Sequence, residues 1–524
     1  MAATDLRPAP SRPAPQRGLH RPLLAHLPFA VLLLAGAVLR LMTWRAYRPA
    51  LLFPDSRIYL LAAAREELQA TRPAGYSAFL WPFLHLHLGG LASISLVQHL
   101  LGLAMAVAIY LLLLRLRVWP WLAALATAPL LLDSMQLALE QYVMADTLFE
   151  ALLLASCLLL LWRRRPGVPL LLAAGLALGL AATVRGVGVL LLAPAAVTAV
   201  AVGLPLGWRR TLLLLAALGI GFALPITAYM TAFKVQHGTF ALTTKTSRFL
   251  YARLAPIADC RGLALPDHER PLCPAEPPEQ RMATNAYMWD MRRSPQHHLV
   301  PPAGRTVEQV LADFDRRVIL HQPVDYAVLV GRDVLHGFRP FRTVGPRDVS
   351  PTPWLLRQRL PSNGRSYRPD ELYRSFAGYG PVLDRPLAGV LARYQHVGHT
   401  PGPVLAACAV AALAAAAGLG RARRSGLRVA AWTFAGLCLV VLVTAAMGSQ
   451  FSWRYQLPQL VLLPPAGALG LSALLRRDLA AATGDPASGR SGLLRLLPLL
   501  RARGTPTAER DAGPSAGRSS PLAD

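Results

Sequence analysis

The segment LLAHLPFAVLLLAGAVLRLMTW, residues 23–44, decides the fold class of this chain. An α-helix of about 20 mostly apolar residues is long enough to cross the roughly 30 Å hydrocarbon core of a bilayer. Runs of the same kind recur along the whole chain, which is 54% hydrophobic, only 16% charged, and has a mean hydropathy of +0.37. Soluble domains carry about 25% charged residues. The sequence therefore predicts an all-α polytopic membrane protein.

Apolar runs bounded by polar or basic residues give the candidate membrane-spanning helices, and we expect about 10–11 of them. Ten can be assigned directly: 23–44, 91–114, 119–132, 147–162, 168–184, 187–204, 211–233, 403–419, 429–447 and 457–475.

Basic clusters in the short loops predict how the chain is oriented. Arginine-rich loops follow the second, fourth, sixth, eighth and tenth runs, at 115–117, 162–166, 208–210, 421–428 and 476–478. Cytoplasmic loops carry an excess of Lys and Arg. We therefore expect a multi-pass plasma-membrane protein with both termini in the cytoplasm. Three segments then lie outside the cytoplasm: 45–90, 133–146 and 234–402.

The formal net charge of +26 and the isoelectric point of about 11.1 would suggest nucleic-acid binding in a soluble protein. Here the basic residues gather at the ends of the apolar runs, which suits membrane topology and anionic headgroups. We expect membrane lipids as partners and no nucleic acid.

The long outside segment is polar and rich in proline, and its stretches 306–320 and 324–338 have a helical pattern, so we expect a partly helical extracytoplasmic domain. The predicted organisation has five parts: a disordered cytoplasmic arm at 1–22, an N-terminal catalytic membrane module at 23–233, the extracytoplasmic domain at 234–402, C-terminal spans at 403–475, and a disordered cytoplasmic tail at 476–524.

Cys260 and Cys273 are the two cysteines of the outside segments. An oxidising compartment favours a disulfide between them, across a short loop. Metal binding is the alternative, but only His268 lies between the two cysteines and no CxxC spacing occurs. The other cysteines, which fall inside apolar runs and act as small apolar residues, are Cys157, Cys408 and Cys438.

The first outside segment begins with FPDSRIY, residues 53–59, and continues into two interfacial stretches at 58–68 and 71–90. Asp55 allows two interpretations. Asp is a frequent helix N-cap. Alternatively, partial burial raises the pKa of the carboxyl and a neighbour such as Arg57 lowers it, which leaves a carboxylate suited to act as a general base. Both interpretations stay open from this stretch alone.

The second outside turn carries Asp133, Glu140 and Asp146, which we expect outside the membrane or at its edge. Acidic residues near membrane depth usually line a polar cavity. Asp146 could instead complement the positive N-terminus of the helix that it opens. If the two outside loops meet, Asp146 is the expected partner of Asp55.

Basic residues also gather at the predicted outer face, where they could snorkel to the interface or hold an anion. They are Arg185, Lys245, Arg248, Arg253 and Arg454, the last followed by Tyr455. Cations beside carboxylates at one membrane face suit a lipid-anchored phosphate donor, because the cations stabilise the phosphate while a carboxylate acts on the acceptor.

Several motifs resemble those of the glycosyltransferase C superfamily, and particularly its protein-mannosyltransferase-like, phospholipid-carrier-dependent group, which includes the aminoarabinose transferases. They occur in the family's order: FPDSRIY (53–59), AGYSAFLWPF (74–83), VMADTLFEALLL (143–154), LALGLAATVRGVGVLLL (176–192) and WRYQLPQLVLLPP (453–465). The resemblance covers mainly 23–233 and the last span. The chain departs from the family in having fewer predicted spans and in placing its long outside segment mid-chain.

The resemblance implies a polytopic enzyme that moves a sugar from a polyprenyl-phosphate donor to a cell-envelope glycan, lipid or protein, with inversion. It implies Asp55 as the first-loop catalytic acid and general base, with Asp146 as the second acid. The residues expected to bind the lipid phosphate or sugar are Arg57, Tyr59, Arg185, Lys245, Arg248, Arg454 and Tyr455.

No cofactor motif or tight metal-ligand cluster is present in the sequence, although some relatives use a divalent metal ion. Two other functions fit the same charges: a transporter or flippase of a lipid-linked sugar, and a non-catalytic envelope-assembly protein. Transporters place charges near the bilayer midplane. Here the charges are predicted at the outer edge, which favours surface chemistry.

Overall fold

The structure is a computed structural model that describes residues 24–86, 88–345, 348–360 and 368–476. The predicted arm at 1–22 and the tail beyond 476 lie outside these residues. Nearly all the regular secondary structure of the described chain is helical, and one two-stranded sheet is present. The prediction of an all-α polytopic membrane protein is confirmed.

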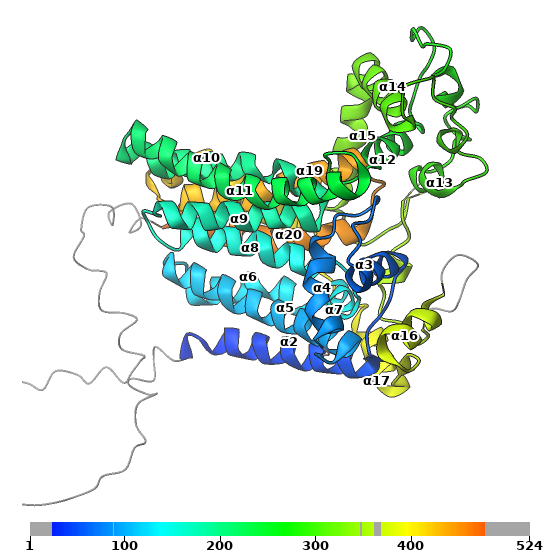
Figure 1. Cartoon of the computed structure of the whole chain (residues 1–524). Helices are drawn as coiled ribbons and strands as arrows, with labels where there is room; N and C mark the ends of the chain where they lie inside the picture. The colour runs from blue at the N-terminus through cyan, green and yellow to red at the C-terminus, as the bar shows by residue number, and fades with distance from the viewer. Residues whose placement is uncertain (1–23, 87, 346–347, 361–367, 477–524) are drawn as a thin grey trace, which may run out of the picture.

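Each predicted span coincides with an apolar helix, and these helices lie side by side in one bundle (Figure 1). They are α2 (Leu27–Ala46), α5 (Gly90–Arg115), α6 (Pro120–Leu132), α8 (Asp146–Leu161), α9 (Val168–Val184), α10 (Leu192–Gly203), α11 (Trp208–His237), α18 (Gly402–Ala416), α19 (Leu427–Gly448) and α20 (Leu457–Leu475).

Six helical segments of the described chain are long and apolar enough to cross a membrane by length and composition. They are Leu27–Ala46, Gly90–Arg115, Gly186–Leu206, Trp208–His237, Leu427–Gly448 and Trp453–Leu475. A further candidate is a broken one, in which α6 is followed after one residue by α7 (Ser134–Gln141) at a bend of 52°.

Small residues let the helices of the bundle approach closely. A Cβ atom at Gly175 of α9 would lie 2.1 Å from the carbonyl oxygen of Leu218 in α11, and one at Gly221 would lie 2.1 Å from that of Leu172. Glycines at such contacts are typical of helix pairs in membranes, because no hydrophobic effect drives association there.

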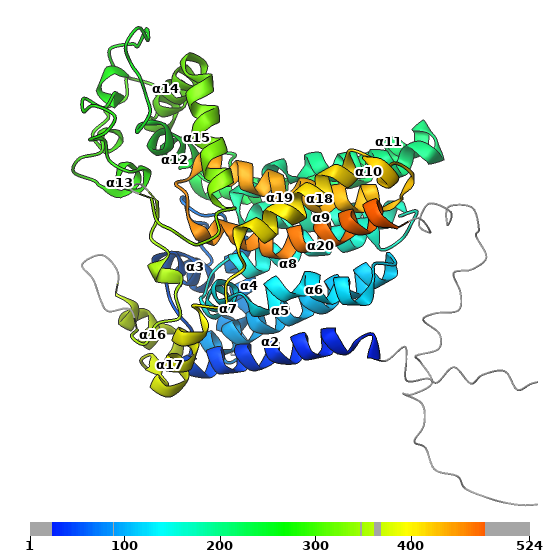
Figure 2. The same cartoon turned by 180° about the vertical axis from the view of Figure 1, so that it is seen from behind.

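The first outside segment folds over one end of the bundle (Figures 1 and 2). It contains β1 (Tyr47–Arg48), α3 (Pro54–Arg65) and α4 (Gly75–His85). Strand β1 pairs antiparallel with β2 (Val382–Leu383), so a distant part of the chain holds the start of this segment.

The segment predicted as one extracytoplasmic domain contributes to two hydrophobic cores. Its first helices, α12 (Thr246–Leu254), α13 (Thr284–Trp289), α14 (Val307–His321) and α15 (Pro323–His336), surround or border a small core of their own. Near that core, Cys260 and Cys273 are joined by a disulfide bond. The later helices, α16 (Pro369–Ala377) and α17 (Arg385–Tyr394), contribute Tyr373 and Leu391 to the core of the bundle instead.

Candidate functional site

The start of α3 presents Asp55 without using it as a helix cap. Pro54 occupies the first helical position, and the Phe53 N–H donates to the Ser56 hydroxyl oxygen at 2.9 Å. The same hydroxyl donates to the Val143 carbonyl oxygen at 2.9 Å. Ser56 therefore caps α3 and links it to the second outside turn. Asp55 makes no capping hydrogen bond, so its carboxylate is available for other contacts.

A short stretch of parallel backbone pairing aligns the two predicted acidic residues. The Leu51 N–H donates to the Gln141 carbonyl oxygen at 2.9 Å, and the Val143 N–H donates to the Leu51 carbonyl oxygen at 3.0 Å. Each of the two paired segments leads into a helix a few residues later. One helix is α3, with Asp55 in its first turn, and the other is α8, which begins at Asp146. The pairing thus brings the two helix starts to the same end of the bundle.

Arg454 lies between the two carboxylates and joins them. Its Nε is 3.0 Å from Asp146 Oδ1, and its Nη1 is 3.7 Å from Asp55 Oδ2. Two further arginines bracket the pair: Arg185 Nη1 lies 2.5 Å from Asp146 Oδ1, and Arg72 Nη2 lies 3.2 Å from Asp55 Oδ1. We call these three arginines and two aspartates the Asp55–Asp146 site.

The two carboxylates differ in their access to solvent. The side chain of Asp55 is 13% exposed, whereas that of Asp146 is 1% exposed. Arg454 is 12% exposed and Arg72 is 24% exposed. Asp55 is thus the more accessible of the two carboxylates, while the buried Asp146 pairs with both Arg185 and Arg454.

The charges around Asp55 set its protonation state. Burial would raise the pKa of the Asp55 carboxyl, but the guanidinium groups of Arg72 and Arg454 outweigh burial and hold the pKa below its ordinary value. Asp55 is therefore ionised at neutral pH and can accept a proton.

Aromatic rings hold the arginines in place. The guanidinium carbon of Arg185 lies 5.6 Å from the ring centroid of Tyr455, and that of Arg454 lies 5.3 Å from that of Trp354. Cation–π contacts at these distances are attractive. Beneath Asp55, the ring of Tyr59 meets that of Tyr76 edge-on at 5.0 Å.

Three of the predicted binding residues are not among the contacts of this site. Lys245 Nζ and Arg248 Nε lie 3.4 and 2.9 Å from Glu308 Oε1, near the start of α12. Arg57 is exposed, and no ion pair joins it to the residues that the structure describes. Of the other outer-face cations, Arg253 pairs with Asp333 at 2.6 Å.

Sequence reasoning missed Arg72 and Trp354. Arg72 had a signal, since it is a basic residue in the same outside segment as Asp55. Nothing in the sequence indicated Trp354, because this residue of the long outside segment contacts Arg454 only in the folded chain.

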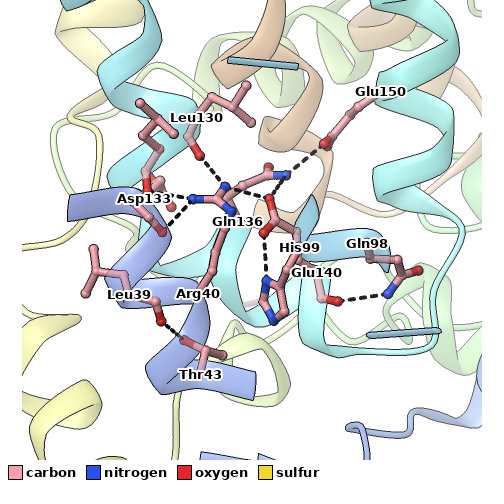
Figure 3. A network of polar contacts seen from close by, with 12 residues as sticks. Leu39, Arg40, Thr43, Gln98, His99, Leu130, Asp133, Gln136, Glu140 and Glu150 are labelled. Atoms are coloured by element: carbon pink, nitrogen blue, oxygen red, sulfur yellow. Dashed lines mark hydrogen bonds and ion pairs between the residues drawn. The ribbon is translucent and has the colours of Figure 1, made fainter. Parts of the chain in front are cut away.

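The structure buries Glu140, which was expected outside the membrane or at its edge, among the helices of the bundle (Figure 3). Its carboxylate lies 2.8 Å from Arg40 Nη2 and 2.9 Å from His99 Nδ1. Asp133 is also buried; it caps α7 by accepting the Met135 N–H and pairs with Arg342 at 2.8 Å. These cations come from distant parts of the chain, so the local sequence does not reveal them.

The residues of the site do not suit a metal ion. Both carboxylates are engaged by arginines, and no three His, Cys, Asp or Glu side chains meet in a metal-binding arrangement within the described chain. We therefore assign no step of the chemistry to a metal.

Residues 91–240 match the family model of dolichyl-phosphate-mannose-protein mannosyltransferases. No curated protein and no solved structure matches the chain. The matched region runs from α5 to α11 and includes Asp146 and Arg185. It confirms the resemblance to protein-mannosyltransferase-like proteins of the glycosyltransferase C superfamily, and it supports a membrane glycosyltransferase whose donor is a polyprenyl-phosphate-linked sugar.

Proposed function

We propose that this protein transfers a sugar from a polyprenyl-phosphate donor to a hydroxyl group of a cell-envelope acceptor, with inversion and with Asp55 as the general base. One observation carries the proposal. The partly accessible Asp55 carboxylate lies between Arg72 and Arg454, and Arg454 also contacts Asp146. A base and several cations are thereby held in one place.

In the proposed reaction, Asp55 removes the proton of the acceptor hydroxyl group. The acceptor oxygen then attacks the anomeric carbon from the face opposite the lipid phosphate. The bond between that carbon and the phosphate oxygen breaks, and the electron pair leaves with the phosphate. A positioned base of this kind contributes roughly 10²- to 10⁴-fold in rate.

The charge of the site suits a phosphate leaving group. Its three guanidinium groups and two carboxylates leave one positive charge in excess. Positive groups that are already fixed by carboxylates and aromatic rings stabilise developing negative charge without reorganising during the reaction. Arg454 and Arg185 are the proposed phosphate contacts, with Arg72 beside the base.

We also propose that the site faces away from the cytoplasm. The Asp55–Asp146 site lies at the end of the bundle covered by α3 and α4, and the arginine-rich loops after α5, α8 and α10 lie at the other end (Figure 1). Basic loops stay in the cytoplasm. An extracytoplasmic site needs a lipid-linked donor, because soluble nucleotide sugars are cytoplasmic.

The test uses purified full-length protein in liposomes, radiolabelled polyprenyl-phosphate sugars and an envelope acceptor fraction. We expect Asp55→Asn to lower transfer by about 10²- to 10⁴-fold while the unfolding temperature shows that the variant is folded. The matched control is Glu67→Gln, which neutralises an exposed acid of the same outside segment and should transfer normally.

Two outcomes would contradict the proposal. Normal transfer by the Asp55→Asn variant would exclude Asp55 as the base. Movement of the labelled donor between leaflets without transfer to any acceptor would identify a transporter instead.

A further inference from the structure

A second group of charges lies buried in the bundle (Figure 3), and its ion pairs do not involve the residues of the Asp55–Asp146 site. Arg40 of α2, His99 of α5 and Glu140 of α7 are each at most 2% exposed. Glu140 Oε1 lies 2.8 Å from Arg40 Nη2, and Glu140 Oε2 lies 2.9 Å from His99 Nδ1. We call these three residues the Glu140 cluster. Burying charges is expensive even when they are paired, and ionisable residues in a membrane bundle usually serve a function.

Arg40 holds the break between α6 and α7. Its guanidinium donates to the carbonyl oxygens of Leu130 and Leu131, both at 3.0 Å. These carbonyls belong to the last turn of α6, where no further helical N–H can reach them. Arg40 thus hydrogen-bonds the end of α6 and pairs with Glu140 of α7 with one side chain.

Both ring nitrogens of His99 have a hydrogen-bond partner. Gln141 donates its amide N–H to the Tyr47 carbonyl oxygen at 2.6 Å, so its Oε1 must face His99 Nε2, at 2.8 Å. His99 Nε2 therefore carries a proton. His99 Nδ1 faces the Glu140 carboxylate, so one further proton lies between these two groups. Every polar contact of the imidazole is thereby satisfied.

The Glu140 cluster is connected to the backbone pairing that leads to the Asp55–Asp146 site. Gln98, the neighbour of His99, donates to the carbonyl oxygens of Glu140 at 2.8 Å and Tyr142 at 2.7 Å. The Tyr76 hydroxyl donates to Gln98 at 2.7 Å. In the same turn, the Gln141 carbonyl and the Val143 N–H pair with Leu51. Side chains and backbone together therefore fix residues 140–143.

A second connection reaches α8. Gln136 Nε2 donates to Glu140 Oε1 at 3.1 Å and to Glu150 Oε2 at 2.9 Å. Glu150 is fully buried and lies one helical turn after Asp146. The cluster therefore contacts both the turn that pairs with the Asp55 segment and the helix that begins at Asp146.

We propose that Glu140, Arg40 and His99 are positioning residues that set where Asp55 and Asp146 lie relative to each other. This proposal depends on the proposed glycosyl transfer only where the test measures kcat and KM. Arg40 and His99 hold Glu140 and Gln141 at the start of the turn at 140–143, and that turn pairs with the segment before α3 and leads into α8. A misplacement of about 1 Å caused far from the reacting atoms can lower a rate about 100-fold.

The test compares Glu140→Gln with the double variant Arg40→Met/Glu140→Gln. The single variant leaves the Arg40 charge buried without its carboxylate and should be less stable. The double variant removes both charges, so its unfolding temperature should return toward that of the wild type. We expect its kcat to stay about 100-fold low while the KM for the donor changes little. His99→Gln, a milder change, should lower kcat in the same direction.

A readout independent of activity is amide hydrogen exchange at Leu51 and Val143, whose N–H groups make the backbone pairing. We expect exchange at both amides to rise at least about tenfold in all three variants. The matched control is Thr198→Val, which removes a buried hydroxyl contact with Thr433 in another part of the bundle and should change neither readout.

The outcomes separate the two proposals. If kcat and exchange recover in the double variant together with stability, the cluster serves only to stabilise the fold and the positioning role is wrong. If the wild type transfers no sugar, the proposed function fails, and exchange at Leu51 and Val143 still decides the positioning role. Unchanged exchange in every variant would overturn it.

Discussion

Asp55 and Asp146 are the same residue type in different surroundings. Asp146 is buried at the start of a helix, where the helix N-terminus and two arginines favour its negative charge. Asp55 is less buried and contacts Arg454 at the longer distance of 3.7 Å. The same bridging arginine therefore holds Asp146 tightly and leaves Asp55 able to exchange a contact for a substrate.

Replacing Arg72 with Gln should move the acid limb of the pH profile to higher pH. With Arg72 present, the pKa of Asp55 lies below its ordinary value, so the carboxylate stays ionised as the pH falls until that lowered pKa is reached. Without Arg72, burial is opposed mainly by Arg454, and the pKa of Asp55 rises. The stability that the ionised carboxylate contributes above its unfolded-state pKa should shrink accordingly.

The measurement is kcat/KM for transfer between about pH 3 and pH 8, a range that covers the ordinary pKa of Asp, about 3.9. Arg65→Gln, at the exposed end of α3, is the control and should leave the acid limb in place. An acid limb that does not move in the Arg72→Gln variant would mean that Asp55 is not the group that titrates.

The helices that were predicted from the sequence are those whose signal lies within a short segment. Apolar runs located the spans and the motif 53–59 located the start of α3, because hydrophobic length and local turn chemistry are properties of short segments. The stretch 133–146 was predicted as a polar turn because it carries three acids, and its helix α7 was not predicted. Its burial as α7 depends on Arg40 and His99, which only the fold brings near.

Gly102 of α5 lies against the Glu140 cluster. A Cβ atom there would lie 2.2 Å from Glu140 Oε1 and 2.8 Å from Arg40 Nη2. Gly102→Ala should therefore displace the buried ion pair and lower both the unfolding temperature and the transfer rate. The control is Gly219→Ala in α11, where nothing lies within 4 Å, and which should gain about 0.5–1 kcal/mol of stability. Equal stability of the two variants would show that the Glu140 cluster tolerates displacement.

In the whole molecule, the apolar helices were predicted from the sequence, but the division of the long outside segment between two hydrophobic cores was not. Composition predicted one domain at 234–402. In the fold, part of it has its own core and part of it joins the bundle, where Trp354 contacts Arg454. That division depends on contacts between residues far apart in the chain, which have no local signature. The same holds for the candidate site: the sequence predicted Asp55 and Asp146 as partners but did not pair either acid with a particular arginine.

The proposed orientation can be tested with single cysteines introduced at exposed positions. Ala303→Cys lies in the long outside segment, and Arg423→Cys lies in an arginine-rich loop at the other end of the bundle. A membrane-impermeant thiol reagent applied to intact cells should label the first, and should label the second only after permeabilisation. The parent chain, whose free cysteines are Cys157, Cys408 and Cys438, gives the background. The reverse labelling pattern would place the site in the cytoplasm.

Arg454, which joins the two carboxylates, stands at the start of the last helix, whereas Asp55 follows the first one. A ribosome synthesises Asp55 about 400 residues before Arg454. Until then the two acids lack their common arginine, and a nascent chain has no finished site. Under the proposed function, a nascent chain should therefore transfer no sugar until Arg454 has been synthesised and has joined the two acids.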